Sequence, residues 1–413
     1  MCPSHDGITQ TDFDCSPCHK RRISRCQLLL HRPIFKKLRD WSERKHAILK
    51  EYLPAFCRAI SSQARGGTIW YVDGYAGAGV YQDSQSPDSP GAEGSPVLAA
   101  RITEQLPYTI NCINVEEDQD NFDSLQRETA RFSHVENIRN DFNAVVEDVL
   151  ARVAGSPAFF FLDSFGTKEL PMDGLVDRIA MRRNPTDVLL RYATSAVRRL
   201  AASYEKDPIR GGANARNLDK WFRGQGWRPL IEQYTGNDRD NALLTYYLGQ
   251  LVSISNGRLS FACDYPIRST DGLTKYHLVF ATGNRLGMKL MSDILFVAET
   301  KYAQDHAAHR TEKEVARRNG QLSLFDPPAP DPDAETHERI AGLKEAILAQ
   351  VQQGEPHWEF DNLRCTLIKH GWFARFTEKD FRAACKELHT EGKIQRISSG
   401  KAWSRETEFT VKQ

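Results

Sequence analysis

A glycine-rich turn directly after an apolar strand limits the folds open to this chain more than any other feature. Residues 69–72 read Ile-Trp-Tyr-Val, and they are followed by Asp73, Gly74, Tyr75, Gly77 and Gly79. Glycines at such a turn let the backbone bend sharply and approach a ligand with no Cβ in the way. A strand, an acid and a glycine turn in this order predict the first strand of a Rossmann-like sheet, which presents a nucleotide-containing cofactor at its carboxyl end.

Apolar runs alternate with helix-like segments between residues 36 and 305, which predicts an α/β layer fold for this region. We expect strands at residues 68–72, 109–115, 137–139, 158–162, 187–192, 259–265 and 276–282. Helical spacing predicts helices over 41–61, where Pro54 would kink or split the helix, and over 286–301. Another helix should begin at Ser95, with serine as its cap and Pro96 at its first position.

Four acidic residues follow four successive predicted strands, namely Asp73, Glu116, Asp141 and Asp163. Because the carboxyl ends of parallel strands meet at one edge of a sheet, we expect these side chains to line one crevice. Glu116 would accept both ribose hydroxyl hydrogens, Asp141 would accept from an adenine amino group, and Asp163 would lie beside the reacting end of the substrate. Asp73 would order the glycine loop or meet a cofactor ammonium. A solvated turn is the alternative for each acid taken singly.

The segment after the glycines favours S-adenosylmethionine over a dinucleotide. The dinucleotide fingerprint leads directly into a helix whose N-terminus receives the pyrophosphate. Here residues 80–94 form a loop rich in Ser, Pro and Asp, and the next helix is expected only near Ser95. An adenosyl sulfonium with an amino acid tail needs no such helix end. We therefore assign the cofactor-binding set, which is Asp73, Gly74, Tyr75, Gly77, Gly79, Glu116 and Asp141.

Several stretches together resemble the bacterial three-Cys-motif partner protein family. They are residues 41–46, 71–79, 94–96, 161–166 and 283–291. The resemblance covers about residues 36–305 and, more weakly, the C-terminal part. It implies a Rossmann-like methyltransferase-type sheet with a winged-helix tail, and a neighbouring radical-SAM-like protein as partner. The three cysteines of the family name belong to that partner.

The acceptor side of the expected crevice carries Asp163, Ser164 and Phe165. The family, like the amino-methyltransferases, usually has proline after the motif acid, and its place is taken here by Ser164. In the amino-methyltransferases this turn accepts the target amino hydrogens, and an aromatic ring stacks on the base. We assign Asp163 and Phe165 as catalytic candidates that orient the acceptor. A base would have to be flipped or single-stranded to reach them.

Four regions are expected along the chain, covering residues 1–35, 36–305, 306–335 and 336–413. The last region shows three amphipathic helices, the third capped by Thr377, and then two strands around a turn, which predicts a winged helix-turn-helix. Basic residues on its third helix and in or beside the wing are candidates for phosphate contacts, namely Arg382, Lys386, Lys401 and Arg405. A winged helix that contacts protein is the alternative.

The linker at 306–335 is rich in proline and acid and contains a short apolar peptide, Gln321-Leu322-Ser323-Leu324-Phe325. This peptide resembles the pentapeptide that binds the bacterial DNA sliding clamp. Clamp binding would involve Gln321, Leu322, Leu324 and Phe325, with Leu324 and Phe325 in an apolar clamp pocket and Gln321 hydrogen-bonded to a polar subsite. Docking of the same side chains on this protein's own surface is the alternative.

The basic N-terminal region holds Cys2, Cys15, Cys18 and Cys26. Cys15 and Cys18 have the spacing of a zinc knuckle, so zinc is one expectation, and a basic arm with incidental thiols is the other. The nine cysteines suit a reducing cytoplasm. The sequence has no apolar run long enough for a membrane span and no signal-peptide pattern, so we expect a cytoplasmic protein.

Three functions remain from the sequence, and the weakest of them is a winged-helix regulator that senses a small molecule. The first is an S-adenosylmethionine-dependent methyltransferase that acts on nucleic acid, DNA rather than RNA, with a base amino group as one acceptor. The net charge of +1 gives no general bias toward nucleic acid, so the basic surface must be local. The second is a catalytically silent methyltransferase fold that recruits a radical-SAM-like partner to DNA.

Overall fold

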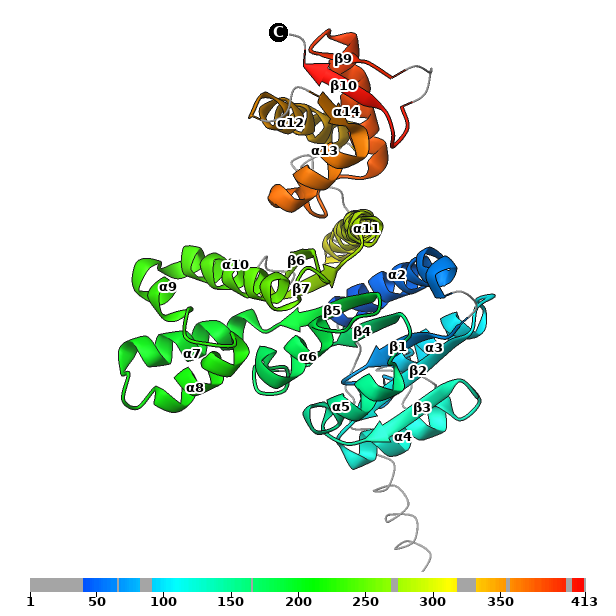
Figure 1. Cartoon of the computed structure of the whole chain (residues 1–413), viewed down its shortest axis with the longest axis vertical. Coiled ribbons are helices and arrows are strands. Elements are labelled where there is room, and N and C mark those ends of the chain that lie inside the picture. Colours follow the sequence, from blue (N-terminus) through cyan, green and yellow to red (C-terminus); the bar gives the residue numbers. More distant parts are fainter. Residues whose placement is uncertain are drawn as a thin grey trace, which may run out of the picture.

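The structure, a computed structural model, describes residues 40–64, 67–81, 91–164, 166–268, 274–317, 332–353, 357–398 and 403–411. Its centre is a seven-stranded sheet with the order β3-β2-β1-β4-β5-β7-β6 (Figure 1). The strands are β1 (Ile69–Asp73), β2 (Ile110–Glu116), β3 (Val135–Arg139), β4 (Ala158–Leu162), β5 (Thr186–Tyr192), β6 (Phe261–Arg268) and β7 (Thr274–Thr282). Strand β7 is antiparallel to β5 and β6, and the others run parallel. The predicted Rossmann-like α/β sheet is confirmed.

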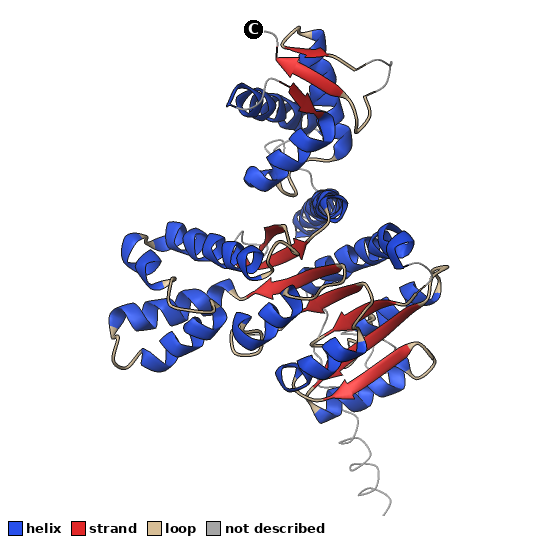
Figure 2. Ribbon diagram, viewed as in Figure 1, coloured by secondary structure: helices blue, strands red, loops and turns tan. Residues whose placement is uncertain are grey.

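Successive side chains of the central strands point to opposite faces of the sheet, so that each face has its own apolar core. In β4, Phe159 and Phe161 belong to one apolar cluster, whereas Phe160 and Leu162 belong to the other. The first face is covered by α2 (Asp40–Ala64), α3 (Ser95–Glu104) and α11 (Arg285–Arg317). The second is covered by α5 (Phe142–Arg152), α6 (Asp177–Ala180), α7 (Thr194–Lys206), α8 (Gly212–Trp221) and α10 (Gly236–Ile254). Both faces of the sheet are therefore covered by helices, as Figure 2 shows.

Further helices complete the connections between strands. Helix α4 (Gln119–Thr129) joins β2 to β3, and η1 (Met172–Val176) precedes α6. Helices α7, α8, α9 (Arg228–Gln233) and α10 stand between β5 and β6 and form the lobe at the left of Figure 1. An aromatic cluster holds this lobe to the sheet, because Tyr192 at the end of β5 packs against Trp221 and Tyr247 with ring centroids 5.6 and 5.2 Å away.

The described part of the C-terminal unit contains three α-helices, the short helical turn η2 and a small antiparallel sheet. Its elements are α12 (Pro332–Gln353), β8 (His357–Glu359), α13 (Phe360–Leu367), η2 (Ile368–Trp372), α14 (Glu378–Thr390), β9 (Ile394–Arg396) and β10 (Glu408–Val411). The strand order is β8-β10-β9. Thr377 caps α14 through a capping box with Asp380, as predicted. The sequence did not predict β8.

Helix α11 is longer than expected, because it continues to Arg317 rather than ending at residue 301. The boundary proposed at residue 305 therefore falls inside one helix, and the clamp-like peptide at 321–325 lies outside the described residues. Helix α2 is continuous from Asp40 to Ala64 with Pro54 inside it. None of the helices in the described ranges is long and apolar enough to cross a membrane.

Candidate functional site

A cavity of about 570 Å³ opens at the carboxyl ends of β1, β2 and β4. Its size is that of a pocket for a small molecule or cofactor. Helix α2, the segments after β1, β2, β3 and β4, and Arg191 near the end of β5 supply its walls. The lining side chains and glycines include Ser42, Lys45, His46, Gly74, Tyr75, Gly77, Gly79, Tyr81, Gly94, Ser95, Glu116, Glu117, Asn121, Asn140, Asp141, Asp163, Glu169 and Arg191. Glu116, Asp141 and Asp163 thus line one cavity, as the predicted parallel sheet required.

The glycines shape the loop after β1 in two ways. Gly77 and Gly79 have φ of +66° and +81°, a left-handed conformation that other residues adopt only with strain. Gly94 returns the chain to this loop, and its amide donates to the Gly79 carbonyl at 2.7 Å. A Cβ on Gly94 would lie 2.9 Å from the Gly79 carbonyl carbon and oxygen. The loop therefore needs glycine, which has no side chain, both at Gly79 and at Gly94.

Asp73 lies beneath the loop and is fully buried, so it is absent from the described residues that line the cavity. Its carboxylate accepts from the Ser95 hydroxyl at 2.6 Å, the Tyr71 hydroxyl at 3.2 Å and the Tyr75 amide at 3.2 Å. Burial raises the pKa of Asp73 to about 6, although these hydrogen bonds oppose the shift. Of the two roles predicted for Asp73, this geometry shows the ordering of the loop.

The expected serine cap of α3 is wrong. The cap position is Gly94, and no side chain caps the helix, although Pro96 stands in its first turn as predicted. The hydroxyl of Ser95 is committed to Asp73 instead. Helix α3 therefore begins directly above a buried carboxylate, which opposes an anionic ligand at this helix end.

Glu116 connects the ends of β1 and β2. Its Oε2 accepts from the Gly77 amide at 2.8 Å, and its Oε1 accepts from the Asp118 amide at 2.9 Å. These bonds fix the carboxylate against the glycine loop at the wall of the cavity. Oε1 also accepts from the Asn121 side-chain amide at 3.3 Å, so it is Oε2 that keeps acceptor capacity for a ligand hydroxyl.

Asp141 combines a structural position with a place in the cavity wall. It is the N-cap of α5, and its carboxylate accepts from the Asn143 amide at 3.0 Å. Tyr75 also lines the cavity, and its ring packs edge-on against Phe142 at 5.7 Å between centroids. The predicted ligand roles of Asp141 and Tyr75 stay predictions.

Asp163 stands at the end of β4 and meets two cationic side chains. The Lys45 side-chain nitrogen, from α2, contacts Asp163 Oδ2, and the Arg191 guanidinium, from β5, lies 4.0 Å from Oδ1. Lys45 is only 4% exposed, and burial together with the charge of Arg191 lowers the pKa of its amine to about 7. Burial likewise lowers the pKa of the neighbouring His46 to about 4.

The sequence did not predict a functional role for Lys45. It lies 118 positions before Asp163 on a helix that precedes the sheet. The resemblance included residues 41–46, but nothing in the local pattern indicated which side chain points into the site. Phe165 lies outside the described residues, and Ser164 is buried with its hydroxyl donating to the Gly166 carbonyl at 3.3 Å.

The candidate nucleic-acid residues of the C-terminal unit are only partly available. Arg382 donates to Glu378 Oε1 at 2.7 Å, and Arg405 lies 3.4 Å from Glu378 Oε2. Lys386 is exposed on α14, and Lys401 lies outside the described residues. Phosphate contact by Arg382 or Arg405 would have to compete with Glu378, so the basic surface is weaker than the sequence alone indicated.

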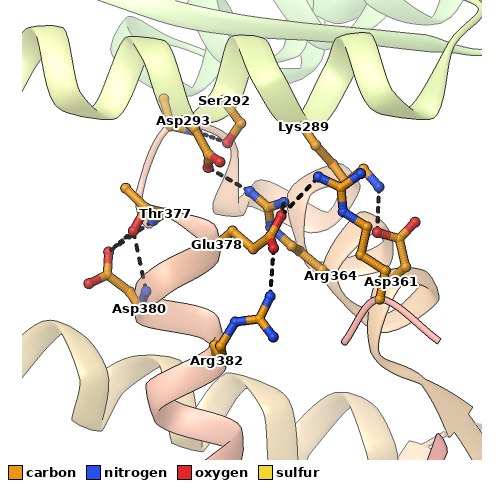
Figure 3. A network of polar contacts seen from close by, with 11 residues as sticks. Lys289, Ser292, Asp293, Asp361, Arg364, Thr377, Glu378, Asp380 and Arg382 are labelled. Atoms are coloured by element: carbon orange, nitrogen blue, oxygen red, sulfur yellow. Dashed lines mark hydrogen bonds and ion pairs between the residues drawn. The ribbon is translucent and has the colours of Figure 1, made fainter. Parts of the chain in front are cut away.

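A buried arginine of the C-terminal unit, Arg364, connects Glu378 of the same unit to α11. Arg364 is 1% exposed and donates to Glu378 at 3.2 Å and to Asp293 of α11 at 2.5 Å (Figure 3). Lys289 of α11 contacts Asp361, and the Ser292 hydroxyl accepts from the Ala374 amide at 3.0 Å. The start of α14 therefore faces α11, as Figure 3 shows.

The proposed zinc ligands Cys2, Cys15, Cys18 and Cys26 lie outside the described residues. Within the described ranges, no group of three or more His, Cys, Asp or Glu side chains is placed to hold a metal ion. The described cysteines are all buried. Zinc therefore stays a prediction for the N-terminal region.

Comparison with known proteins gives no family by sequence, because no family model and no curated protein matches the chain. Solved structures with a similar fold include an O-methyltransferase from Bacillus cereus in complex with SAH, at 11% identity and a TM-score of 0.31, over 63% of this chain and 89% of that one. A protein from Legionella pneumophila matches at 12% identity and a TM-score of 0.36, over 62% and 90%. A geranyl diphosphate C-methyltransferase from Streptomyces coelicolor matches at 11% and 0.22, over 55% and 80%.

Proposed function

We propose that this chain is an S-adenosylmethionine-dependent methyltransferase with nucleic acid as its acceptor. The observation that carries the proposal is the cavity itself, where the glycine loop after β1 and the acids after β2, β3 and β4 form one wall. This is the topological position at which open parallel sheets bind nucleotide-containing ligands.

The charges around the loop fit a cationic cofactor better than a dinucleotide. A buried carboxylate, Asp73, already occupies the space under the N-terminus of α3 and holds Ser95. A pyrophosphate placed there would meet this negative charge, whereas a sulfonium or ammonium would be attracted to it. Gly77 and Gly79 would face the cofactor, with Glu116 placed for the ribose hydroxyls and Asp141 for the adenine edge.

A bound cofactor of this kind supplies an activated methyl group, so the protein's task is mainly to position the acceptor. Asp163 follows β4, on the side of β1 away from β2 and β3, and lies beside Lys45 and Arg191, where we place the acceptor. The residues that bind and those that face the reaction thus come from neighbouring strand ends of the same sheet.

The choice of nucleic acid is supported by the C-terminal unit. We infer a winged helix from its order of helix, strand, helix, helix, strand, strand, and exposed Lys386 lies on its third main helix. The family resemblance adds a radical-SAM-like protein as a proposed partner. The silent adaptor remains the rival function, and it predicts that the cavity binds no adenosyl ligand.

Calorimetry with S-adenosylmethionine and S-adenosylhomocysteine tests the cofactor. We expect both to bind, and Glu116→Ala to weaken binding about 10-fold or more through loss of a charged hydrogen-bond acceptor. Glu147→Ala is the matched control, because Glu147 is an exposed α5 glutamate whose described ion pair is with Arg178. Binding of NAD instead would contradict the proposal, and binding of neither adenosyl ligand would favour the adaptor.

The acceptor is tested by transfer of a radiolabelled methyl group. Single-stranded DNA, duplex DNA from a methylation-deficient host, total RNA and bulk protein are offered in parallel. We expect label in nucleic acid, and in single-stranded DNA more than in duplex, because a paired base must first leave the stack. If label is found only in protein, the proposed methyltransferase activity stands, and the proposal that nucleic acid is the acceptor is wrong.

A further inference from the structure

Lys45 is a buried lysine at the wall of the cavity, and its placement is unusual for a surface helix. It projects from α2 between the glycine loop and the end of β4, and its nitrogen contacts Asp163. Its side chain is 6% exposed. Lysine is rarely buried to this degree without a partner, and here the partner itself belongs to the cavity wall.

The Lys45 amine is surrounded by groups of both charges, and some of them disfavour its protonated form. Arg191 places a second cation next to it, with its guanidinium 4.4 Å from the centre of the Tyr276 ring and the Lys45 nitrogen 5.9 Å from the same ring. The charged and titratable groups facing the amine are His46 of α2, Asp73 of β1, Asp163 after β4, Arg191 of β5 and Tyr276 of β7. Burial and Arg191 lower the pKa of Lys45 to about 7, and the negative charges of Asp73 and of the contacting Asp163 carboxylate oppose them.

A second buried lysine, Lys289, also pairs with a carboxylate, and it serves as an example of a purely structural ion pair. Lys289 of α11 is also 4% exposed and contacts a carboxylate, Asp361. That pair joins α11 to the C-terminal unit (Figure 3). Lys289 is not among the described residues that line the cavity. Lys45 differs because it lines the cavity in which the acceptor would lie, and because a second cation, Arg191, acts on its amine.

We propose that Lys45 is the general base of the transfer, with Asp163 as the residue that orients its amine, and that the acceptor is therefore a hydroxyl or amino group that must lose a proton. This inference rests on the proposed methyltransferase function. Asp163 Oδ2 accepts one N–H of the amine, which leaves the nitrogen lone pair for the acceptor.

The step balances with the groups named. The acceptor's O–H or N–H bond breaks and its proton moves to the Lys45 nitrogen, while the acceptor atom forms the new bond to the methyl carbon. The electron pair of the broken sulfur–carbon bond stays on sulfur, which leaves as a neutral thioether. Lys45 becomes an ammonium ion that pairs with the Asp163 carboxylate, so this charge is compensated inside the site.

Direct titration of the amine is the first test and needs no acceptor. Lysines of the full-length protein are reductively methylated with ¹³C-formaldehyde, a reagent small enough to enter the cavity, and their NMR shifts are followed from pH 5 to 11. The Lys45 resonance, assigned by its loss in Lys45→Arg, should titrate near pH 7 and shift when S-adenosylhomocysteine is added. A Lys45 that titrates near 10, or that formaldehyde does not reach, would overturn the inference.

Transfer by variants is the second test. Lys45→Arg keeps a cation for Asp163 but cannot take up a proton, because arginine stays charged. It should bind S-adenosylhomocysteine within about threefold of the unaltered protein and lose transfer about 100- to 10,000-fold. Lys289→Met is the control for loss of a buried lysine and should transfer normally.

The outcomes separate the two levels of the proposal. If the unaltered protein does not bind S-adenosylhomocysteine, the proposed function fails, and this inference fails with it. If it binds and transfers, yet Lys45→Arg is fully active, only the general base is overturned and Lys45 is a structural partner of Asp163. Loss of transfer in Lys45→Arg with retained binding of S-adenosylhomocysteine supports the inference. If the residual transfer rate of Lys45→Arg no longer rises with pH near 7, this supports the inference further.

Discussion

Replacement of Gly94 by alanine tests how closely the cofactor loop depends on bare backbone. An ideal Cβ at this position would lie 2.9 Å from the Gly79 carbonyl carbon and oxygen and 3.3 Å from its Cα. Because the obstacle is backbone rather than a flexible side chain, the two segments must separate by about 0.5 Å before ordinary contact is restored. The separation would also stretch the 2.7 Å hydrogen bond from the Gly94 amide to Gly79.

The expected cost of this overpacking is about 1–3 kcal/mol. If the displaced loop binds the cofactor correspondingly less well, affinity for S-adenosylhomocysteine falls about 5- to 150-fold, which calorimetry measures directly. Gly249→Ala is the matched control, because a Cβ there meets nothing within 4 Å and the residue lies inside α10. It should leave affinity unchanged and stabilise the protein slightly. Equal affinity of Gly94→Ala and the unaltered protein would refute the assignment of this loop to the cofactor.

Other predictions address stability, pH and the regions beyond the described residues. Arg364→Ala should destabilise the C-terminal unit by about 3 kcal/mol in urea unfolding, because it removes the buried cation that pairs with Asp293 and Glu378. Arg152→Ala, at a pair with Glu136 that is exposed on both sides, should cost about 1 kcal/mol or less. Burial raises the pKa of Asp187 to about 6, so its contribution to stability is full below pH 4 and declines by about 3 kcal/mol as pH rises to 7. Asp187→Asn should flatten that part of the curve, and an unchanged slope would contradict the shift. Leu324→Ala with Phe325→Ala should abolish retention of the bacterial sliding clamp in pull-down, and clamp binding that survives the change would exclude this peptide. Metal analysis of the full chain and of a form lacking residues 1–30 should show zinc only in the former if the N-terminal cysteines bind it.

The convergence of the acids was predictable because it depends on a property that local sequence encodes. Apolar runs such as residues 158–162 predict buried strands. In a parallel sheet, the residues that directly follow the strands all lie at the same edge. Glu116, Asp141 and Asp163 needed no further information to be placed together. The left-handed conformations of Gly77 and Gly79 follow from the same kind of local signal.

Features that depend on tertiary placement were not predictable in this way. Lys45 enters the site from a helix far away in the sequence, and its direction follows from how α2 packs on the sheet. Strand β8 has only three residues and exists through its pairing with β10. The pairing of Arg382 with Glu378 could have been foreseen, because the two stand four positions apart on one helix.

A crystal structure of the protein soaked with S-adenosylhomocysteine tests the central claim most directly. We predict electron density for the adenosyl group between the Gly77–Gly79 turn and the Glu116 carboxylate, with the sulfur pointing toward Lys45 and Asp163. Density on the opposite edge of the sheet, in the second cavity of about 480 Å³ beside Tyr52 and Asp187, would contradict the account. So would a first cavity that stays free of ligand at saturating concentration.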